Sequence, residues 1–257
     1  MALADIRQPS DLRPLTLPQL ETLAEEIREF VVSAVSETGG HLGSNLGAVE
    51  LSIALHRVFE SPMDPILWDT GHQAYVHKIL TGRKSGFAGL RQQDGISGYP
   101  NREESRHDFI ENSHASTVLS YAHGLAIARD AGVAPHRHIV AVIGDGGIQM
   151  TIQELGTIMQ NNINVKILIL NNRFLGMVRQ WQDLFHEKRY SFVDIASPDY
   201  VTVAKGYKIE GNSIEERKDL INALETMLNH DGPYLLEVFV GKENNVFPMV
   251  PQGCGVS

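Results

Sequence analysis

A strand–helix–strand unit between residues 138 and 176 constrains the fold of this 257-residue chain more than any other stretch. Two apolar, β-branched runs, Ile139–Ile143 and Val165–Leu170, are typical of fully buried parallel strands. Between them, residues 150–160 have the length and apolar spacing of a helix. The sequence therefore predicts an α/β fold with a parallel sheet.

Polar residues fall where these two strands end. Asp145 follows the first strand between Gly144 and Gly146, where small residues let the backbone approach an anion, and Asn172 closes the second strand. In such a sheet, ligands bind beyond the carboxyl ends of the strands. Carboxylate, amide and carbonyl oxygens suit Mg²⁺, whose remaining positions are filled by phosphate oxygens and water. The unit predicts a site for a metal-bridged diphosphate, although Gly-Asp-Gly alone is also an ordinary turn.

The order of strand, Gly-Asp-Gly, helix, strand and Asn-Asn resembles the cofactor signature of thiamine diphosphate enzymes. In that signature the Asp, the second Asn and the carbonyl two residues later hold Mg²⁺. The resemblance implies Asp145, Asn172 and the backbone of Phe174 as metal ligands. It also implies the thiamine diphosphate-binding fold, a three-layer α/β/α arrangement with a mostly parallel central sheet. The alternative is a plain α/β turn.

Composition narrows the function classes. A net charge of −9 argues against a nucleic-acid partner, which would want a basic face. No apolar run approaches the length that spans a bilayer, and the first residues lack the apolar core of a secretion signal. The single cysteine excludes a disulfide framework. We expect a soluble cytoplasmic protein with one domain over residues 1–257, because no repeat or linker interrupts the chain.

Two family resemblances divide the chain. Residues from about 5 to 146 resemble the N-terminal domain of 1-deoxyxylulose-5-phosphate synthase, a transketolase-like family. The matching runs are Gly40–Leu51, Trp68–Arg83, Gly98–Ser105 and Ser113–Ser116.

Residues from about 147 to 257 resemble the C-terminal domain of acetohydroxyacid (acetolactate) synthase. These matching runs are Gln153–Thr157, Leu170–Gln182, Arg189-Tyr190, Asp231–Leu236 and Glu243–Pro251. Both families use this kind of domain for the diphosphate end of the cofactor, so the chain is interpreted as a mosaic, by natural divergence or by engineering.

The resemblances also imply a partner. In both families a second domain grips the aminopyrimidine ring and supplies a glutamate that activates the cofactor. One diphosphate-binding domain accounts for all 257 residues. We therefore expect a second subunit that carries the pyrimidine-binding domain, in an α₂β₂-type assembly, and little activity from this chain alone.

Three histidines are candidate catalytic residues. The resemblance to the synthase family implies that His41, His72 and His114 face the thiazolium ring and the substrate. Imidazole titrates near neutral pH and suits proton transfer during carbon–carbon bond chemistry. The alternative is that these histidines cap loops or form hydrogen bonds within the core.

The remaining candidates would contact the cofactor or the substrate. Ser113 and Ser116 precede a helix and can donate to a diphosphate, with plain N-capping as the alternative. Trp181 matches the substrate-pocket tryptophan of acetohydroxyacid synthase, with core packing as its alternative. The other cofactor-binding candidates lie in or after the two loops: Gly144, Gly146, Gly147, Ile148, Gly176 and Met177.

The predicted function is that of a thiamine diphosphate- and Mg²⁺-dependent enzyme subunit. It would decarboxylate a 2-keto acid such as pyruvate and transfer the acyl unit to an aldehyde or ketone. Glyceraldehyde phosphate as acceptor would follow the first resemblance, and a second keto acid would follow the other. Transketolase-type ketol transfer, simple 2-keto acid decarboxylation and a catalytically silent cofactor-binding or regulatory module stay open as alternatives.

Overall fold

A computed structural model describes residues 3–135, 137–242, 245 and 247 of the chain. It forms two compact units. The first comprises Met1–Pro62, Gly71–Ser113 and Val246–Ser257, and the second comprises Met63–Thr70 and His114–Asn245. One domain can consist of two such units, so the single-domain organisation stays a prediction. Most of the expected match at Glu243–Pro251 lies outside the described residues.

The second unit is built on a five-stranded parallel sheet with the order β1-β2-β3-β5-β4. The strands are β1 (Ile66–Trp68), β2 (Val140–Gly144), β3 (Lys166–Asn171), β4 (Glu210–Ile214) and β5 (Tyr234–Phe239). The two strands predicted around the Gly-Asp-Gly turn, β2 and β3, pair in register from Val140 with Lys166 to Gly144 with Leu170. Both are almost wholly buried, which is why their sequences are continuous apolar runs.

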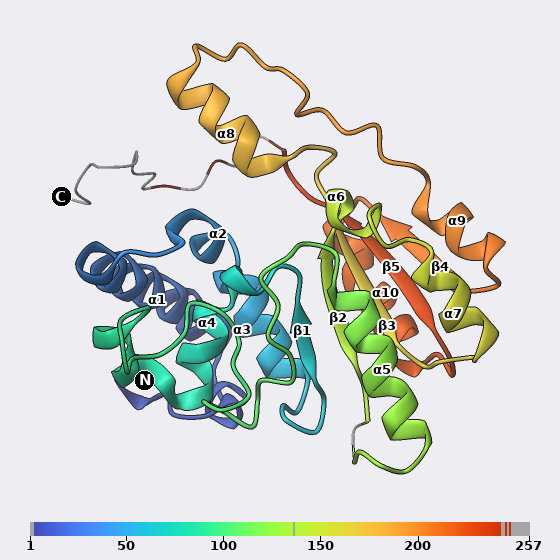
Figure 1. The fold of residues 1–257 in the computed structure, drawn as a ribbon, viewed down its shortest axis with the longest axis horizontal. Helices are drawn as coiled ribbons and strands as arrows, with labels where there is room; N and C mark the ends of the chain where they lie inside the picture. Colours follow the sequence, from blue (N-terminus) through green and yellow to red (C-terminus); the bar gives the residue numbers. More distant parts are fainter. Residues whose placement is uncertain (1–2, 136, 243–244, 246, 248–257) are drawn as a thin grey trace. The chain divides into compact units, whose positions relative to one another are not determined.

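Helices cover both faces of this sheet. They are α5 (Val118–Asp130), α6 (Asp145–Ile148), α7 (Glu154–Gln160), α8 (Gly176–Phe185), α9 (Tyr200–Gly206), η6 (Arg217–Asp219) and α10 (Leu220–Asn229). In Figure 1, α5 and α7 lie on one face and α10 lies on the other. The predicted three-layer α/β/α fold with a parallel sheet is confirmed.

The sequence misplaces the edge strand and the helix that follows it. Residues 207–210 predict a short strand, and the capping-box spacing of Ser213 and Glu216 predicts a helix from Ser213. In the structure, β4 runs over Glu210–Ile214 and α10 begins at Leu220. Four of the five residues of β4 are not buried, so no apolar pattern marks it. Backbone pairing with β5 holds this edge strand instead.

The first unit is helical. Its elements are η1 (Leu3–Asp5), η2 (Pro9–Leu12), α1 (Leu17–Thr38), α2 (Leu42–Leu46), α3 (Val49–Val58), η3 (Gly71–Gln73), α4 (Tyr75–Lys78), the π-helical turn η4 (Ile79–Arg83) and η5 (Lys84–Gly89). Thr16 opens α1, with its N–H donating to Gln19 Oε1 at 2.9 Å, and Gly39 ends the helix with a φ of 73°.

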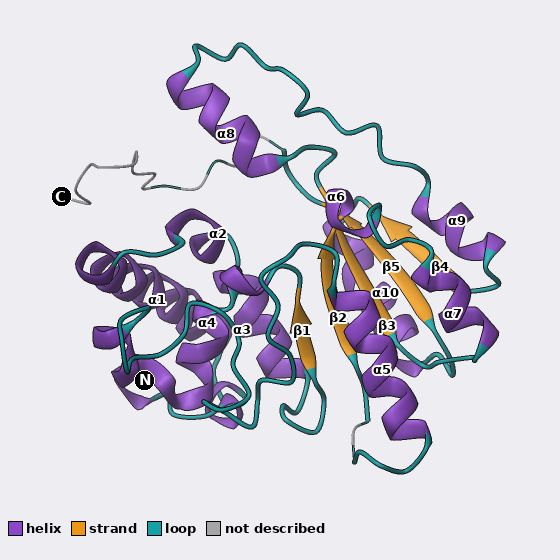
Figure 2. Cartoon of the chain, in the orientation of Figure 1, coloured by secondary structure: helices purple, strands orange, loops and turns teal. Residues whose placement is uncertain are grey.

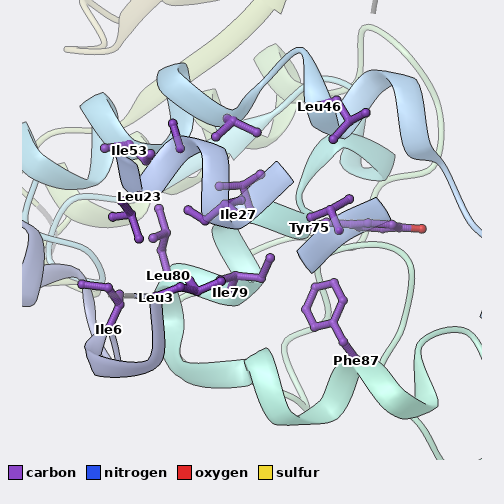
Figure 3. Close-up of a cluster of buried hydrophobic side chains, with 14 of the residues drawn as sticks. Leu3, Ile6, Leu23, Ile27, Leu46, Ile53, Tyr75, Ile79, Leu80 and Phe87 are labelled. Atoms are coloured by element: carbon purple, nitrogen blue, oxygen red, sulfur yellow. The ribbon is translucent and has the colours of Figure 1, made fainter. Parts of the chain in front are cut away.

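Apolar side chains from these helices form one cluster. Figure 3 shows Leu23 and Ile27 of α1, Ile53 of α3 and Ile79 of η4 in it. Leu23 and Ile27 belong to the apolar stripe that makes α1 amphipathic.

A buried polar network fixes the loop that follows η5, which has neither helix nor strand up to residue 113. Figure 2 draws this stretch ahead of α5 as loop. Asp108 accepts from His77 Nε2 at 2.8 Å and from the Asn101 N–H at 2.7 Å, and Arg83 holds both carboxylate oxygens. His77 Nδ1 in turn pairs with His56 Nε2 at 2.8 Å. The irregular backbone is therefore anchored by buried side chains.

Among the described residues, no helix is long and apolar enough to cross a membrane.

Candidate functional site

Asp145 lies where the sequence predicted, directly after β2 at the first position of α6. Its side chain is only 3% exposed, and Ser197 Oγ donates to Oδ2 at 2.9 Å. Burial raises the pKa of this carboxyl, while hydrogen bonds from Ser197 and from the backbone N–H groups of Gly146, Asp145 and Arg173 lower it. Within the described residues Asp145 makes no ion pair. A buried carboxylate without a countercharge is a favourable ligand for a cation.

The loop after β3 lies at the same edge of the sheet as Asp145, because β2 and β3 are neighbouring parallel strands. Asn171 Oδ1 accepts from the Arg173 N–H, and Asn172 Oδ1 accepts from the Phe174 N–H, both at 2.9 Å. These two amide side chains fold the backbone into a tight turn with Arg173 at a φ of 59°. Gly144 pairs in register with Leu170, and a Cβ at Gly146 would lie 3.3 Å from the Leu175 side chain. The structure therefore brings Asp145 close to the turn that holds the predicted ligands Asn172 and Phe174.

The donor set fits Mg²⁺. A carboxylate, an amide oxygen and a backbone carbonyl are all hard oxygen ligands, and this ion needs few of them from the protein. An amide oxygen has two lone pairs, so the bond from the Phe174 N–H leaves one for a metal. No group of three or more His, Cys, Asp or Glu side chains with metal-ligand geometry occurs in the described part of the chain.

The glycines around Asp145 differ in their surroundings. A Cβ at Gly147 would lie 2.7 Å from Asp69 Oδ2, and one at Gly146 would lie 3.1 Å from Ile195. A Cβ at Gly144 would meet no atom within 4 Å. Gly147 is therefore needed for packing, whereas Gly144 leaves open space at the carboxyl end of β2. Ile148 is fully buried.

Asp69, a residue that sequence reasoning missed, joins two loops of the second unit. Its carboxylate accepts from the Ser116 N–H at 2.8 Å and also receives hydrogen bonds from the Thr117 and Val118 N–H groups at the start of α5. Burial nevertheless raises the pKa of Asp69. Its sequence signals were its place directly after an apolar run that ends in Trp68 and its position inside the matching run Trp68–Arg83.

Asp69 changes the interpretation of the serines expected to bind diphosphate. The N-terminus of α5 already holds a carboxylate. Ser116 is only 2% exposed, and its hydroxyl pairs with Thr151 Oγ1 at 2.6 Å. The Ser116 side chain is thus engaged within the protein. Ser113 is exposed and lies in the other unit.

The helix α8 carries three further candidates. Gly176 starts it, with the position of a Cβ only 3.0 Å from Asn172 Nδ2. Met177 and Trp181 are 40% and 39% exposed, and the indole packs against the Phe185 ring at 4.8 Å. Trp181 is therefore not a core residue of this structure, and its contact with substrate stays a prediction.

Two of the three candidate histidines meet in the first unit. The rings of His41 and His72 lie 4.9 Å apart, and Tyr99 lies 6.0 Å from His41. Burial lowers the pKa of both histidines, with a further lowering from Arg91 at His41 and from His41 at His72. Both imidazoles are thus neutral at pH 7 and able to accept a proton. His114 is exposed and belongs to the second unit.

Asn45 and Tyr75 hold this histidine pair, and neither was predicted. The buried Asn45 donates from Nδ2 to the carbonyls of His41 at 2.6 Å and His72 at 2.8 Å. The Tyr75 hydroxyl accepts from the His41 N–H at 3.1 Å. Both residues lie inside the Gly-rich matching runs, which was the available signal.

Residues 3–180, well over half of the 257, match the sequence pattern of the family described as 1-deoxy-D-xylulose-5-phosphate synthase. The chain belongs to this family.

Curated members of the 1-deoxy-D-xylulose-5-phosphate synthase family are close in sequence. The synthase of Mycobacteroides abscessus is 64% identical over 146 residues, which cover 57% of this chain and 23% of that protein. The synthase of Mycolicibacterium gilvum is 55% identical over 172 residues, covering 66% and 27%. The synthase of Thermobifida fusca is 57% identical over 175 residues, covering 67% and 27%. The chain thus spans about a quarter of the length of these relatives.

The family match corrects one expected boundary. We expected the synthase pattern to stop near residue 146, but it continues to residue 180, through β3 and into α8. The metal-binding loop therefore lies within the synthase match. The resemblance of residues 147–257 to acetohydroxyacid synthase stays a prediction. The 1-deoxy-D-xylulose-5-phosphate synthase family depends on thiamine diphosphate, normally with Mg²⁺, which agrees with the donor set beside Asp145.

Proposed function

We propose that this chain is the diphosphate-binding part of a thiamine diphosphate- and Mg²⁺-dependent enzyme. The enzyme decarboxylates a 2-keto acid of the pyruvate type and transfers the acyl unit to an aldehyde such as glyceraldehyde phosphate. The observation that carries the proposal is the buried Asp145 carboxylate, which lacks an ion-pair partner in the described chain and lies beside the Asn172–Phe174 turn.

We assign a separate task to each group of candidate residues. Asp145, Asn172 and the Phe174 carbonyl hold the metal, and Gly144 and Gly146 let the diphosphate approach the backbone. Bound there, the cofactor supplies the carbanion chemistry of decarboxylation and carboligation. His41 and His72, held neutral by burial, move protons on the substrate.

The aminopyrimidine-binding domain comes from outside these 257 residues. In the curated relatives the matched region is part of one longer chain. The missing domain is therefore supplied either by a further part of the same polypeptide or by a second subunit in an α₂β₂-type assembly. We place the enzyme in the cytoplasm.

Calorimetry of the chain with thiamine diphosphate and Mg²⁺ tests the proposal. Asp145→Ala is expected to weaken cofactor binding by at least about tenfold, because the metal loses its carboxylate ligand. The control is Asp219→Asn, which removes an exposed carboxylate of the same unit. Equal affinity of wild type and Asp145→Ala would contradict the metal assignment.

Absence of cofactor binding under every condition, including an added pyrimidine-binding domain, would sink the proposal itself. Cofactor binding without turnover of pyruvate and an aldehyde, again with that domain supplied, would favour the silent binding module. Release of CO₂ without a coupled product would favour the simple decarboxylase.

A further inference from the structure

A buried carboxylate of β5, Glu237, is hydrogen-bonded to Asn171, the residue just before the predicted metal-binding turn Asn172–Phe174. Glu237 is 3% exposed, and its Oε1 accepts from Asn171 Nδ2 at 2.6 Å. Asn171 is 1% exposed and ends β3 beside β5, in register with Phe239. A carboxylate is unfavourable in the middle of a buried sheet unless its surroundings compensate for the lost hydration.

The Asn171 side chain links Glu237 to the backbone of the turn. Its Nδ2 donates to Glu237, and its Oδ1 accepts the Arg173 N–H at 2.9 Å. Arg173 has a φ of 59°, a conformation that non-glycine residues rarely adopt without support. One hydrogen-bonded chain therefore runs from Glu237 through Asn171 to the turn that holds the predicted metal ligands Asn172 and Phe174.

Glu237 adds a second negative charge near the site. Its Asn171 partner is neutral, and the Arg173 guanidinium lies over the Phe239 ring at 4.6 Å. In the described part of the chain, no lysine or arginine forms an ion pair with Glu237. The Tyr200 hydroxyl donates to the Asp145 carbonyl at 2.6 Å. Burial raises the pKa of Tyr200, and the charges of Asp145 and Glu237 raise it too. The two carboxylates therefore act on the same small region of the protein.

We propose that Glu237 and Asn171 are positioning residues of the metal site. Their hydrogen bond fixes the turn that presents Asn172 and Phe174, and the Glu237 charge favours a divalent cation beside Asp145. Neither side chain ligates the ion, and both act through the turn and through the electrostatic potential. This inference rests on the proposed function, because it assigns a role toward the metal of that site.

Amide hydrogen exchange of the metal-free chain measures the first part of the role. Asn171→Ala and Glu237→Ala should each raise the exchange rate of the Arg173 N–H by about tenfold or more, because its acceptor is lost or released. Glu237→Gln keeps an acceptor for Asn171 Nδ2 and should exchange like wild type. The control is Lys166→Met, which removes a buried charge from the opposite end of β3.

Titration with Mn²⁺ in the presence of thiamine diphosphate, followed by electron paramagnetic resonance, measures the second part. Asn171→Ala and Glu237→Ala should bind Mn²⁺ about 10- to 100-fold more weakly, the usual effect of losing a residue that orients a metal ligand. Glu237→Gln should lie between them and wild type because it loses the charge alone. Lys166→Met should bind like wild type even if it is less stable.

The outcomes separate this inference from the proposed function. A wild-type chain that binds no Mn²⁺ with the cofactor would overturn the proposed function and this inference together. A wild type that binds, with Asn171→Ala and Glu237→Ala binding equally well, would overturn only the inference. Faster exchange without a change in Mn²⁺ affinity would overturn it as well.

Discussion

Single residues at the carboxyl ends of β2 and β3 combine close packing with open space. The carboxylate of Asp145 is buried and accepts a hydrogen bond from Ser197 Oγ, and a Cβ at Gly147 would collide with the Asp69 carboxylate. Gly144, three residues earlier, faces no neighbouring atom. Gly147 is thus needed because a side chain would not fit, whereas Gly144 has room for one.

Alanine substitutions separate these reasons. Gly147→Ala places a Cβ 2.7 Å from Asp69 Oδ2 and should lower the free energy of unfolding by about 1–3 kcal/mol. Gly144→Ala should leave the free energy of unfolding within about 0.5 kcal/mol of wild type. Gly144→Ala should still weaken thiamine diphosphate binding, if the cofactor approaches this backbone. Urea unfolding and calorimetry measure the two effects, and equal stability losses would contradict the assignment.

Buried histidines predict a loss of stability in mild acid. Burial, together with the nearby charges of His77, Arg106 and Arg83, lowers the pKa of His107 to about 4. Burial also lowers the pKa values of His56 and His77. An unfolded histidine has a pKa of about 6.5. Between pH of about 6.5 and 4, the unfolded chain therefore binds more protons, and stability falls as the pH falls.

For His107 the change should be on the order of 1 kcal/mol, measured by urea unfolding between pH 7.5 and 4.5, and His56 and His77 should add to it in the same direction. Asp69 and Asp145, whose pKa values burial raises, act in the opposite direction. The His107→Asn variant isolates the histidine contribution, because Asn can still bond Ser61 Oγ, which lies 2.9 Å from His107 Nδ1. An unchanged pH slope in this variant would show that His107 is not responsible.

At the scale of elements, the N-terminus of α5 is capped by the side chain of Asp69, which follows β1 and is far from α5 in the sequence. The Asp69 carboxylate after β1 receives the first N–H groups of the helix, as an N-cap would. Asp69→Ala should lower the free energy of unfolding by about 1–2 kcal/mol. Asp130→Ala, at the other end of α5, is the matched control and should change it little. A circular dichroism melt and urea unfolding distinguish the two variants.

In the first unit, a single side chain, Asn45, likewise holds two segments of the chain together, the one around His41 and the one around His72. Asn45 joins the carbonyls of His41 and His72, and its Oδ1 accepts the Tyr75 N–H at 2.8 Å. Asn45→Ala leaves these groups without their partner and should lower stability by about 2–4 kcal/mol. In the complete enzyme, Asn45→Ala should lower kcat more than it changes KM, because His41 and His72 lose their orientation. Asn45→Ala with wild-type kinetics would separate the histidines from catalysis.

At the scale of the whole molecule, the chain holds the parts of a metal and diphosphate site in its second unit and a histidine pair in its first. We expect the isolated chain to bind thiamine diphosphate weakly and to turn over little pyruvate. Adding a pyrimidine-binding domain, fused or separate, should raise both by at least about tenfold. Gel filtration with a coupled activity assay checks this expectation. Full turnover by the 257-residue chain alone would contradict it.

The amino-acid sequence by itself determined the parallel sheet, the place of Asp145 and Asn172 at its carboxyl edge, and the family of the N-terminal part. These features depend on local patterns, such as apolar runs with polar residues at their ends. Only the tertiary structure decided which distant side chains support the site. Asp69, Ser197 and Glu237 reach it from other strands and loops. The structure also placed β4, whose polar residues are held by backbone pairing that leaves no trace in sequence hydropathy.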